Sequence, residues 1–220
     1  MTTVANRPRA KVHNRDRDAE ILDAARTVFE ERGFEAASIA GIARRAHVAE
    51  GTIYLYSATK RDLLLKVVRR WYEGLIAEIE EALAERVSVE AKLRYFAHRQ
   101  FRVFAEDAAI GRLLVRELRT APDYADTDLY QLNRRYTRLF TSAVRAGIET
   151  GEISSEVPSN LARDLFFGGI EHAGMGGMGG LGPARIAERA ETFFALFWKA
   201  VAGDAVASEA PRRSGFAKRV

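Results

Sequence analysis

Helical periodicity extends over most of this 220-residue chain, and it restricts the possible folds more than any other feature. Apolar residues recur at intervals of three and four, as Ile21, Ala25, Val28 and Phe29 do in the first segment. Such spacing places side chains on one face of an α-helix. Only five prolines interrupt the pattern. The sequence therefore predicts an all-α protein of about nine helices.

Short polar or glycine-containing links separate the predicted helices. These helices cover about residues 17–32, 38–46, 51–56, 60–85, 88–105, 107–120, 124–149, 158–174 and 183–202. Gly33 is a typical helix stop, while Ser38 and Thr59 are typical N-caps. The long helix that begins at Lys60 is expected to join two domains.

Composition excludes several classes of function. The chain has no cysteine, so disulfides, thiolate metal sites and cysteine nucleophiles are impossible. Its four histidines are scattered, and we predict neither a metal site nor a cofactor. No run of about 18 apolar residues occurs, and the N-terminal segment lacks the apolar centre of a signal peptide. We expect a cytoplasmic protein that does not enter a membrane.

Basic residues are concentrated at both ends of the chain. Residues 1–17 contain five basic residues and one acidic residue, and residues 204–220 contain four and two. We interpret 1–17 as a flexible basic arm and 204–220 as a flexible basic tail. A basic arm of this kind often follows the DNA backbone, and a solvated tail without a partner is the alternative.

The stretch GTIYLYSATKRDLL at residues 51–64 is too short and too polar for an independent helix. It follows the short helix SIAGIARRA and the link HVAE, a pattern typical of a helix-turn-helix whose second helix enters the major groove. We assign base recognition to Glu50, Gly51 and Thr52 at the start of that helix. The residues assigned to phosphates are Tyr54, Tyr56 and Lys60. Arg44 and Arg45 are further DNA-binding candidates, or else a solvated face.

Residues 18–68 resemble the DNA-binding domain of the TetR family of bacterial transcriptional regulators. The resemblance rests on the ordered segment AARTVFEERGFEAASIAGIARRAHVAEGTIYLYSATKRDLL. It implies phosphate contacts for Tyr54, Tyr56 and Lys60, and it places the N-cap Ser38 near a phosphate. It also implies a helix-turn-helix domain over 18–64 and a helical ligand-binding and dimerisation domain over 65–203.

Ser57 departs from the family pattern, which usually has phenylalanine at this position. That ring packs into the core of the small domain, and its loss normally costs about 3 to 5 kcal/mol if nothing fills the space. The departure leaves two interpretations of Ser57 open. It occupies a buried site that its neighbours have repacked, or it lies on the surface.

The last two predicted helices combine apolar and small residues, as in a seam between helices of two protomers. The dimerisation candidates are Leu161, Leu165, Gly168, Gly169, Phe193, Phe194, Phe197 and Val201. A core within one protomer is the alternative. The glycine-rich loop at 173–183 contains GMGGMG, but it lacks the preceding strand of a dinucleotide-binding motif, so we interpret it as a flexible connector.

The middle helices are rich in large apolar residues, which favours an apolar effector. The candidate ligand-binding residues are Trp71, Leu75, Phe96, Phe101, Phe104, Leu114, Leu118, Tyr136 and Phe140, each of which could equally be ordinary core. The segments GTIYLY and RELRTAPDY are similar to acyl-CoA-responsive fatty-acid regulators of the family. In that case Arg94, Arg99 and Arg102 are available for the CoA phosphates, or form a solvated face.

The leading hypothesis is a homodimeric, ligand-responsive regulator that binds operator DNA, most often a repressor in this family. Its effector is a long-chain acyl-CoA or, alternatively, a planar aromatic or drug-like molecule. A helical interaction module without DNA binding is a second hypothesis. An enzyme is the third, but the sequence contains no catalytic spacing or nucleophile motif to support it.

Overall fold

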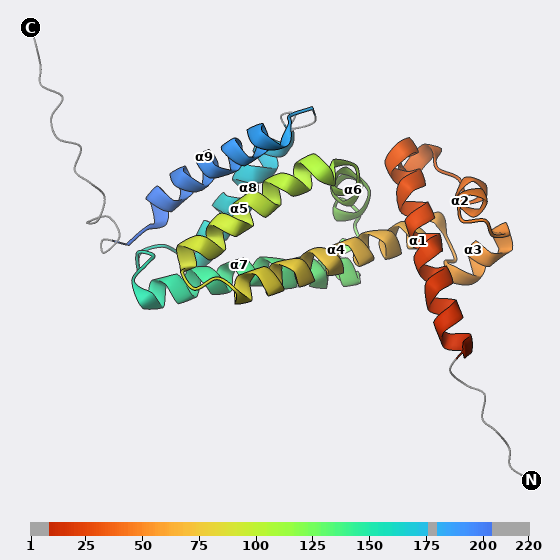
Figure 1. Ribbon diagram of the computed structural model, residues 1–220, viewed down its shortest axis with the longest axis horizontal. Coiled ribbons are helices and arrows are strands. Elements are labelled where there is room, and N and C mark those ends of the chain that lie inside the picture. The colour runs from red at the N-terminus through yellow and green to blue at the C-terminus, as the bar shows by residue number, and fades with distance from the viewer. Residues whose placement is uncertain (1–8, 176–179, 204–220) are drawn as a thin grey trace, which may run out of the picture. The chain divides into compact units, whose positions relative to one another are not determined.

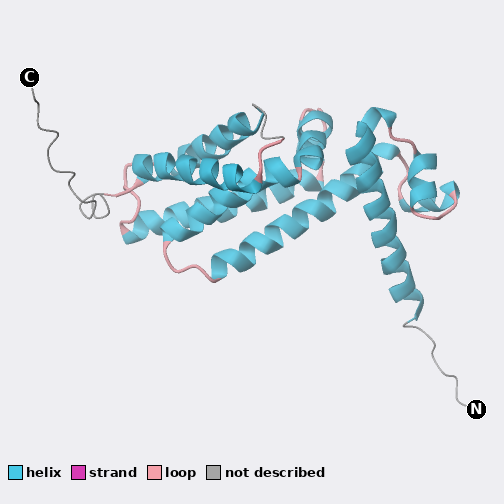
Figure 2. Ribbon diagram, turned by 45° about the horizontal axis from the view of Figure 1, so that its top comes forward, coloured by secondary structure: helices cyan, strands magenta, loops and turns pink. Residues whose placement is uncertain are grey.

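A computed structural model describes residues 9–175 and 180–203 of the chain (Figure 1). Its α-helices are α1 (Arg9–Ala36), α2 (Ile39–Arg45), α3 (Glu50–Tyr56), α4 (Lys60–Ala84), α5 (Val89–Glu106), α6 (Ala108–Leu113), α7 (Asp128–Thr150), α8 (Ser159–Met175) and α9 (Pro183–Val201). Between α6 and α7 lie η1, a π-helix over Leu114–Arg119, and η2, a 3₁₀-helix over Tyr124–Asp126. Helices and connecting loops make up this part of the chain, which contains no strand (Figure 2). The all-α prediction is confirmed.

The first helix begins earlier than the sequence pattern predicted. It starts at Arg9, so the second half of the predicted flexible arm 1–17 is helical, and residues 1–8 lie outside the described part. The segment from Arg9 to Arg17 contains no glycine or proline that would stop a helix. Gly33 interrupts the helix with φ 75° and ψ 171°, a conformation that favours glycine, as its predicted role as a helix stop requires. The predicted tail 204–220 is also outside the described residues.

The predicted single helix at 107–120 is divided in the structure. It begins as α6 and continues from Leu114 as the π-helix η1, which is a rare helix type that often occurs at functional sites. The following helix starts at Asp128 and not at Tyr124, because the chain first forms the short turn η2. Hydrophobic periodicity cannot distinguish these helix types over so few residues.

The chain folds into two compact units. The first contains the described residues up to Ala77 together with Asp107–Arg134, and the second contains Glu78–Glu106 and the described residues from Arg135 onward. The predicted boundary at residues 64 and 65 differs from this division, because α4 and α7 are long helices that each belong to both units. Segment 107–134, which the sequence assigned to the ligand-binding domain, belongs to the first unit.

The core of the first unit joins α1, α2, α3 and the beginning of α4. Its members are fully or almost fully buried apolar side chains with helical spacing. They include Ile21, Ala25, Val28, Phe29, Ile42, Ala43, Ile53, Leu63, Leu64, Val67 and Val68. Ile53 is the only buried residue of α3, so this helix contributes a single side chain to the core.

The core of the second unit is a cluster of aromatic rings from α5, α7, α8 and α9. Phe140 of α7 lies at its centre, with its ring centroid 4.4 Å from that of Phe166 and 5.5 Å from that of Phe96. Phe197 of α9 is 5.1 Å from Phe166. Rings at these separations attract one another beyond their burial. The cluster therefore fixes the relative positions of the four helices within this unit.

None of the described helices is both long and apolar enough to cross a membrane. Among the same residues, no group of three or more histidine, aspartate or glutamate side chains is arranged so that it could hold a metal ion.

Candidate DNA-binding and effector sites

Helix α2 and the turn after it have the geometry of a helix-turn-helix. Ser38 is the N-cap of α2, and its hydroxyl oxygen accepts a hydrogen bond of 3.1 Å from the backbone N–H of Gly41. The N-cap role that the sequence predicted for Ser38 is confirmed. The turn passes through His47 at φ 54°, a left-handed conformation that is uncommon for a residue other than glycine.

Helix α3 exposes most of its surface to solvent. Glu50 and Gly51 at its start are exposed, and Thr52 is half-buried. A β-carbon built on Gly51 would meet nothing within 4 Å, so this end of the helix has an open approach. Tyr54 is 54% exposed and Leu55 is 90% exposed. These two neighbouring side chains form an exposed surface near the end of α3.

The basic candidates around α3 differ in the contacts that their side chains already make. Arg44 is exposed, and Arg45 is exposed but pairs with Glu31 of α1 at 3.0 Å. The Lys60 ammonium donates to the backbone carbonyls of Glu35 and Ala37 at 3.2 and 3.1 Å, and lies 4.5 Å from the centroid of the Phe34 ring. Lys60 therefore caps the end of α1. An ammonium has three protons, so one remains for a phosphate.

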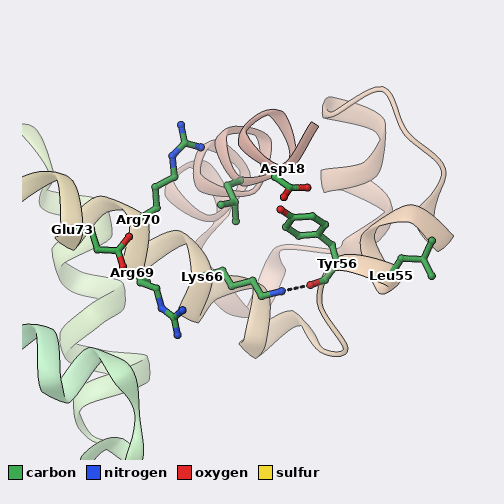
Figure 3. Close-up of a pocket in the computed structure, with 8 residues that line it drawn as sticks. Asp18, Leu55, Tyr56, Lys66, Arg69, Arg70 and Glu73 are labelled. Atoms are coloured by element: carbon green, nitrogen blue, oxygen red, sulfur yellow. Dashed lines mark hydrogen bonds between the residues drawn. The ribbon is translucent and has the colours of Figure 1, made fainter. Parts of the chain in front are cut away.

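Tyr56 is less exposed than Tyr54. Its side chain is half-buried, and its hydroxyl faces Asp18 of α1 across a groove of about 520 Å³ (Figure 3). Burial raises the pKa of this hydroxyl, and the negative charge of the nearby Asp18 carboxylate raises it further. A tyrosine hydroxyl has one proton to donate. In this arrangement the hydroxyl faces Asp18, and the phosphate contact of Tyr56 stays a prediction.

Ser57 is buried, with 3% of its surface exposed. It is the C-cap of α3, where its backbone N–H donates to the Ile53 carbonyl at 2.8 Å. Its hydroxyl donates to the Thr59 carbonyl at 3.3 Å. The structure thus favours the buried interpretation of this position over the surface one.

Ion pairs join segment 107–134 to α1 and α4 within the first unit, among them Arg69 of α4 with Asp128. Arg26 of α1 donates to Asp107 at 2.7 Å, and Arg61 of α4 binds both oxygens of Asp123 at 2.8 and 2.7 Å. The hydrogen bond from Arg61 is the main cause of a lowered pKa of the Asp123 carboxyl. A bidentate arginine–carboxylate contact fixes direction as well as distance.

The nine candidate ligand-binding residues divide between the two units. Trp71, Leu75, Leu114 and Leu118 belong to the first unit, and the other five belong to the second. The members of the second unit are Phe96, Phe101, Phe104, Tyr136 and Phe140, of which all but Phe104 are buried in the aromatic core. Neither the groove of Figure 3 nor a second one of about 570 Å³ next to His47 contains any of the nine.

The basic residues considered for the CoA phosphates already have carboxylate partners. Arg99 is 8% exposed and donates to both oxygens of Glu78 at 2.8 and 2.9 Å, and Arg102 reaches the same carboxylate at 3.4 Å. Arg94 pairs with Glu90 at 2.5 Å and also with Glu191 of α9. A phosphate at these arginines would have to displace a carboxylate.

The dimerisation candidates separate into buried and exposed residues. Phe194, Phe197 and Val201 are buried within the protomer, and Phe193 is half-buried against Gly169. Phe193 lies so close that a β-carbon on Gly169 would be 3.0 Å from its ring. The exposed members are on α8, with Leu161 at 60%, Leu165 at 57% and Gly168 also exposed. Leu196 of α9, which the sequence analysis did not select, is 68% exposed.

Comparison with known proteins identifies the family. Residues 21–67 match the family described as bacterial regulatory proteins, tetR family, and residues 86–173 match the tetracyclin repressor-like C-terminal domain. The chain is 30% identical over 152 residues to the fatty acid metabolism regulator protein of Bacillus subtilis (strain 168), covering 69% of this chain and 78% of that protein. The chain belongs to the TetR family.

Two further TetR-type relatives agree with this assignment. The crystal structure of FadR from Bacillus subtilis in complex with stearoyl-CoA has a TM-score of 0.70 and 25% identity, covering 81% of this chain and 96% of that one. The transcriptional repressor KstR2 of Rhodococcus jostii (strain RHA1) is 24% identical, covering 66% of this chain and 72% of that protein. These TetR-family relatives are regulators of transcription, which sets the enzyme hypothesis aside.

Several residues that contact or lie beside α3 in the TetR-type DNA-binding unit were not predicted from the sequence. Leu55, Asp18 and Lys66 surround the end of α3, and Arg61 contacts segment 107–134. The helical pattern marked Asp18, Lys66 and Arg61 only as polar positions, and their partners are distant in sequence. Leu55 could have been found from the sequence. It follows the buried Ile53 by two positions, which places it on the opposite side of the helix.

Substitution of Ser57 by phenylalanine tests how this TetR-family member repacked its core. We expect Ser57→Phe to lower the free energy of unfolding by about 1 to 3 kcal/mol, because a ring must enter a closed site. Ser57→Ala is the matched control, and loss of one hydrogen bond should cost about 0.5 to 1.5 kcal/mol. Thermal melting of both variants measures the difference. A higher melting temperature for Ser57→Phe would show an unfilled site and contradict the expectation.

Proposed function

We propose that this chain is a cytoplasmic, homodimeric transcriptional repressor that binds operator DNA and is released from it by a small apolar ligand. The observation that carries the proposal is the helix-turn-helix with its open, exposed α3 surface, in a chain that belongs to the TetR family. Glu50, Gly51 and Thr52 read base edges at the start of α3. Tyr54 donates to a phosphate, and the apolar side chain of Leu55 contacts thymine methyl groups or sugars.

Phosphate contacts fix the position of the protein on the duplex. Ser38 lies exposed at the N-terminus of α2, where its hydroxyl and the first backbone N–H groups favour an anion. Arg44 and the Lys60 ammonium add positive charge on the same side of the helix-turn-helix. The ammonium has one N–H left to donate to a phosphate. Arg45 takes part only if its exposed pair with Glu31 opens, and exposed pairs of this kind contribute little stability.

A fatty acyl-CoA is the effector that we propose first. Two observations support it: the FadR structure with a TM-score of 0.70 was solved with stearoyl-CoA, and the second unit has an aromatic, apolar core. An acyl chain would enter between rings that are now in contact, so binding requires a rearrangement of side chains. A planar aromatic or drug-like effector is the alternative, because Phe96, Tyr136 and Phe140 offer ring faces and edges.

The exposed leucines of α8 and α9 support a homodimer. Leu161, Leu165 and Leu196 project from helices that also present the exposed Gly168, and small residues allow helices to approach closely. A symmetric pair of α8–α9 faces would bury all three leucines in both protomers. Two DNA-binding units related by a two-fold axis fit two half-sites of an operator.

Salt dependence and sequence preference test the DNA-binding assignment. The probes are a duplex that the wild-type protein selects from a random-sequence pool, and a scrambled duplex of equal length and composition. Lys60→Met should weaken binding to both duplexes and lower the salt slope by roughly one, as loss of one phosphate contact does. Thr52→Ala should change the preferred sequence instead.

Two controls accompany this measurement. Lys199→Met removes an exposed charge from α9 and should leave both affinities unchanged. Thermal melting of Lys60→Met is needed because Lys60 also caps α1. Failure of the wild-type protein to enrich any sequence would favour the alternative of a helical module without DNA binding.

Chain length tests the proposed effector. Each buried methylene contributes about 0.8 kcal/mol, so affinity should rise several-fold for each added pair of carbons until the site is full. We expect the melting temperature to rise along a series of medium to long acyl-CoA esters. The ester that binds most tightly should also release the selected duplex most completely, because release depends on differential affinity for the two states. Free CoA is the control, and a flat response across the series would eliminate the acyl-CoA proposal.

A charge placed on the leucine face tests the proposed dimer. Leu165→Glu should convert the dimer to a monomer in analytical ultracentrifugation, since burial of an unpaired carboxylate at an apolar seam is costly. Val87→Glu is the matched control, because Val87 is 97% exposed in the loop between α4 and α5. An unchanged dimer in Leu165→Glu would place the interface elsewhere, and a monomeric wild-type protein would contradict the proposal.

A further inference from the structure

The C-terminal end of α3 is held by one lysine. Tyr56 is the last residue of this helix, and the last carbonyls of a helix have no partner within it. The Lys66 ammonium of α4 donates to the Tyr56 carbonyl, as Figure 3 shows. A positive charge at this end also interacts favourably with the helix dipole. Lys66 thus acts as a C-cap for α3 that comes from another helix.

The same ammonium also contacts the side chain of Tyr56. It lies 4.9 Å from the centroid of the Tyr56 ring, within the range of a cation–π interaction. Lys66 therefore holds both the backbone and the ring of one residue. Since Lys66 is part of α4, these two contacts set the direction in which α3 leaves the core of the first unit.

The hydroxyl of Tyr56 is held on its other side by α1. It faces the Asp18 carboxylate (Figure 3), and burial together with the negative charge of that carboxylate raises its pKa. The Oδ1 atom of Asp18 is buried without a hydrogen-bond partner among the described residues. Movement of Tyr56 away from Asp18 would remove the hydroxyl that faces this carboxylate, and buried polar atoms without a partner are costly. The contact therefore resists opening.

Tyr56 is connected in this way to both neighbouring helices, and the exposed residues of α3 immediately precede it. Tyr54 and Leu55 are two of the exposed large hydrophobic side chains of the described chain. The direction in which they point depends on the orientation of the helix. Only Ile53 anchors α3 in the core. A single buried side chain and the cap at Ser57 leave a short helix few fixed points, and the contacts of Tyr56 add to them.

We propose that Asp18 and Lys66 are positioning residues for sequence recognition, which they serve by fixing Tyr56 at the end of the recognition helix. Tyr56 acts as the connection between α1, α3 and α4 and does not donate to a phosphate. The proposal rests on the proposed function of α3 as the DNA-reading element. It concerns what orients that element, which the family assignment does not state.

A positioning role and a phosphate contact have different consequences for binding. Loss of a phosphate contact weakens binding to all sequences by a similar factor and lowers the salt slope. Loss of orientation weakens base contacts, so it affects the selected duplex and spares the scrambled one. The ratio of the two affinities is therefore the decisive quantity.

The experiment measures the affinity of full-length variants for the selected and the scrambled duplex at several salt concentrations. Lys66→Met should reduce the ratio of the two affinities by about tenfold, the scale of one charge-assisted hydrogen bond. Lys66→Arg should restore most of the ratio, because arginine can also donate to the carbonyl. Arg69→Met is the matched control, since Arg69 is on the same helix and lines the same groove but pairs with Asp128.

Two conservative variants keep the test valid if Lys66→Met folds poorly, which melting curves would reveal. Tyr56→Phe and Asp18→Asn should each lower the ratio, and the double variant should lower it no further than the stronger single one, since both remove the same contact. Equal losses on both duplexes with a lower salt slope in Tyr56→Phe would overturn the proposal in favour of a phosphate contact. An unchanged ratio in all three single variants would overturn it as well. If the wild-type protein shows no preference between the duplexes, the proposed function itself fails.

Discussion

Helix α3 has seven residues, and its position depends on contacts that its own sequence does not supply. A helix this short gains too few internal hydrogen bonds to offset the cost of nucleation. The missing stabilisation comes from burial of Ile53, from the C-cap at Ser57 and from the contacts of Tyr56 with Asp18 and Lys66. The surface that we propose for DNA contact is therefore ordered by residues that lie outside it.

The anchors of α3 come from α1 and α4, and both helices have further fixed contacts in the first unit. Lys60 of α4 holds the end of α1, and Arg61 holds Asp123 in the segment after η1. Exposed ion pairs contribute little to stability, so these contacts matter mainly for geometry. Helix α4 continues into the second unit beyond Ala77.

The sequence predicted the fold class and most helix positions because both depend on local patterns. Residues close together in the sequence determine the apolar spacing of α1 and α4, the Ser38 cap and the stop at Gly33. The π-helix at Leu114–Arg119 could not be predicted, since its apolar spacing resembles that of an α-helix. The helical start at Arg9 was missed because charge alone suggested a flexible arm.

Site residues were predictable where exposure decides their role and unpredictable where a distant partner does. Tyr54 and Gly51 are exposed, as their predicted contacts with DNA require. Tyr56 has the same chemistry as Tyr54, but Asp18 lies 38 positions earlier in the chain and no local rule connects the two. Among the dimer candidates, hydrophobicity could not separate the buried Phe197 from the exposed Leu165, because both suit an apolar face.

A crystal structure of the protein with its selected operator duplex tests the central claim most directly. The account predicts that Tyr56 still faces Asp18 and contacts Lys66 in the complex, while Thr52, Tyr54 and Leu55 meet the DNA. The positions of these side chains relative to the phosphates decide the matter. A Tyr56 hydroxyl that has left Asp18 and donates to a phosphate would contradict the account.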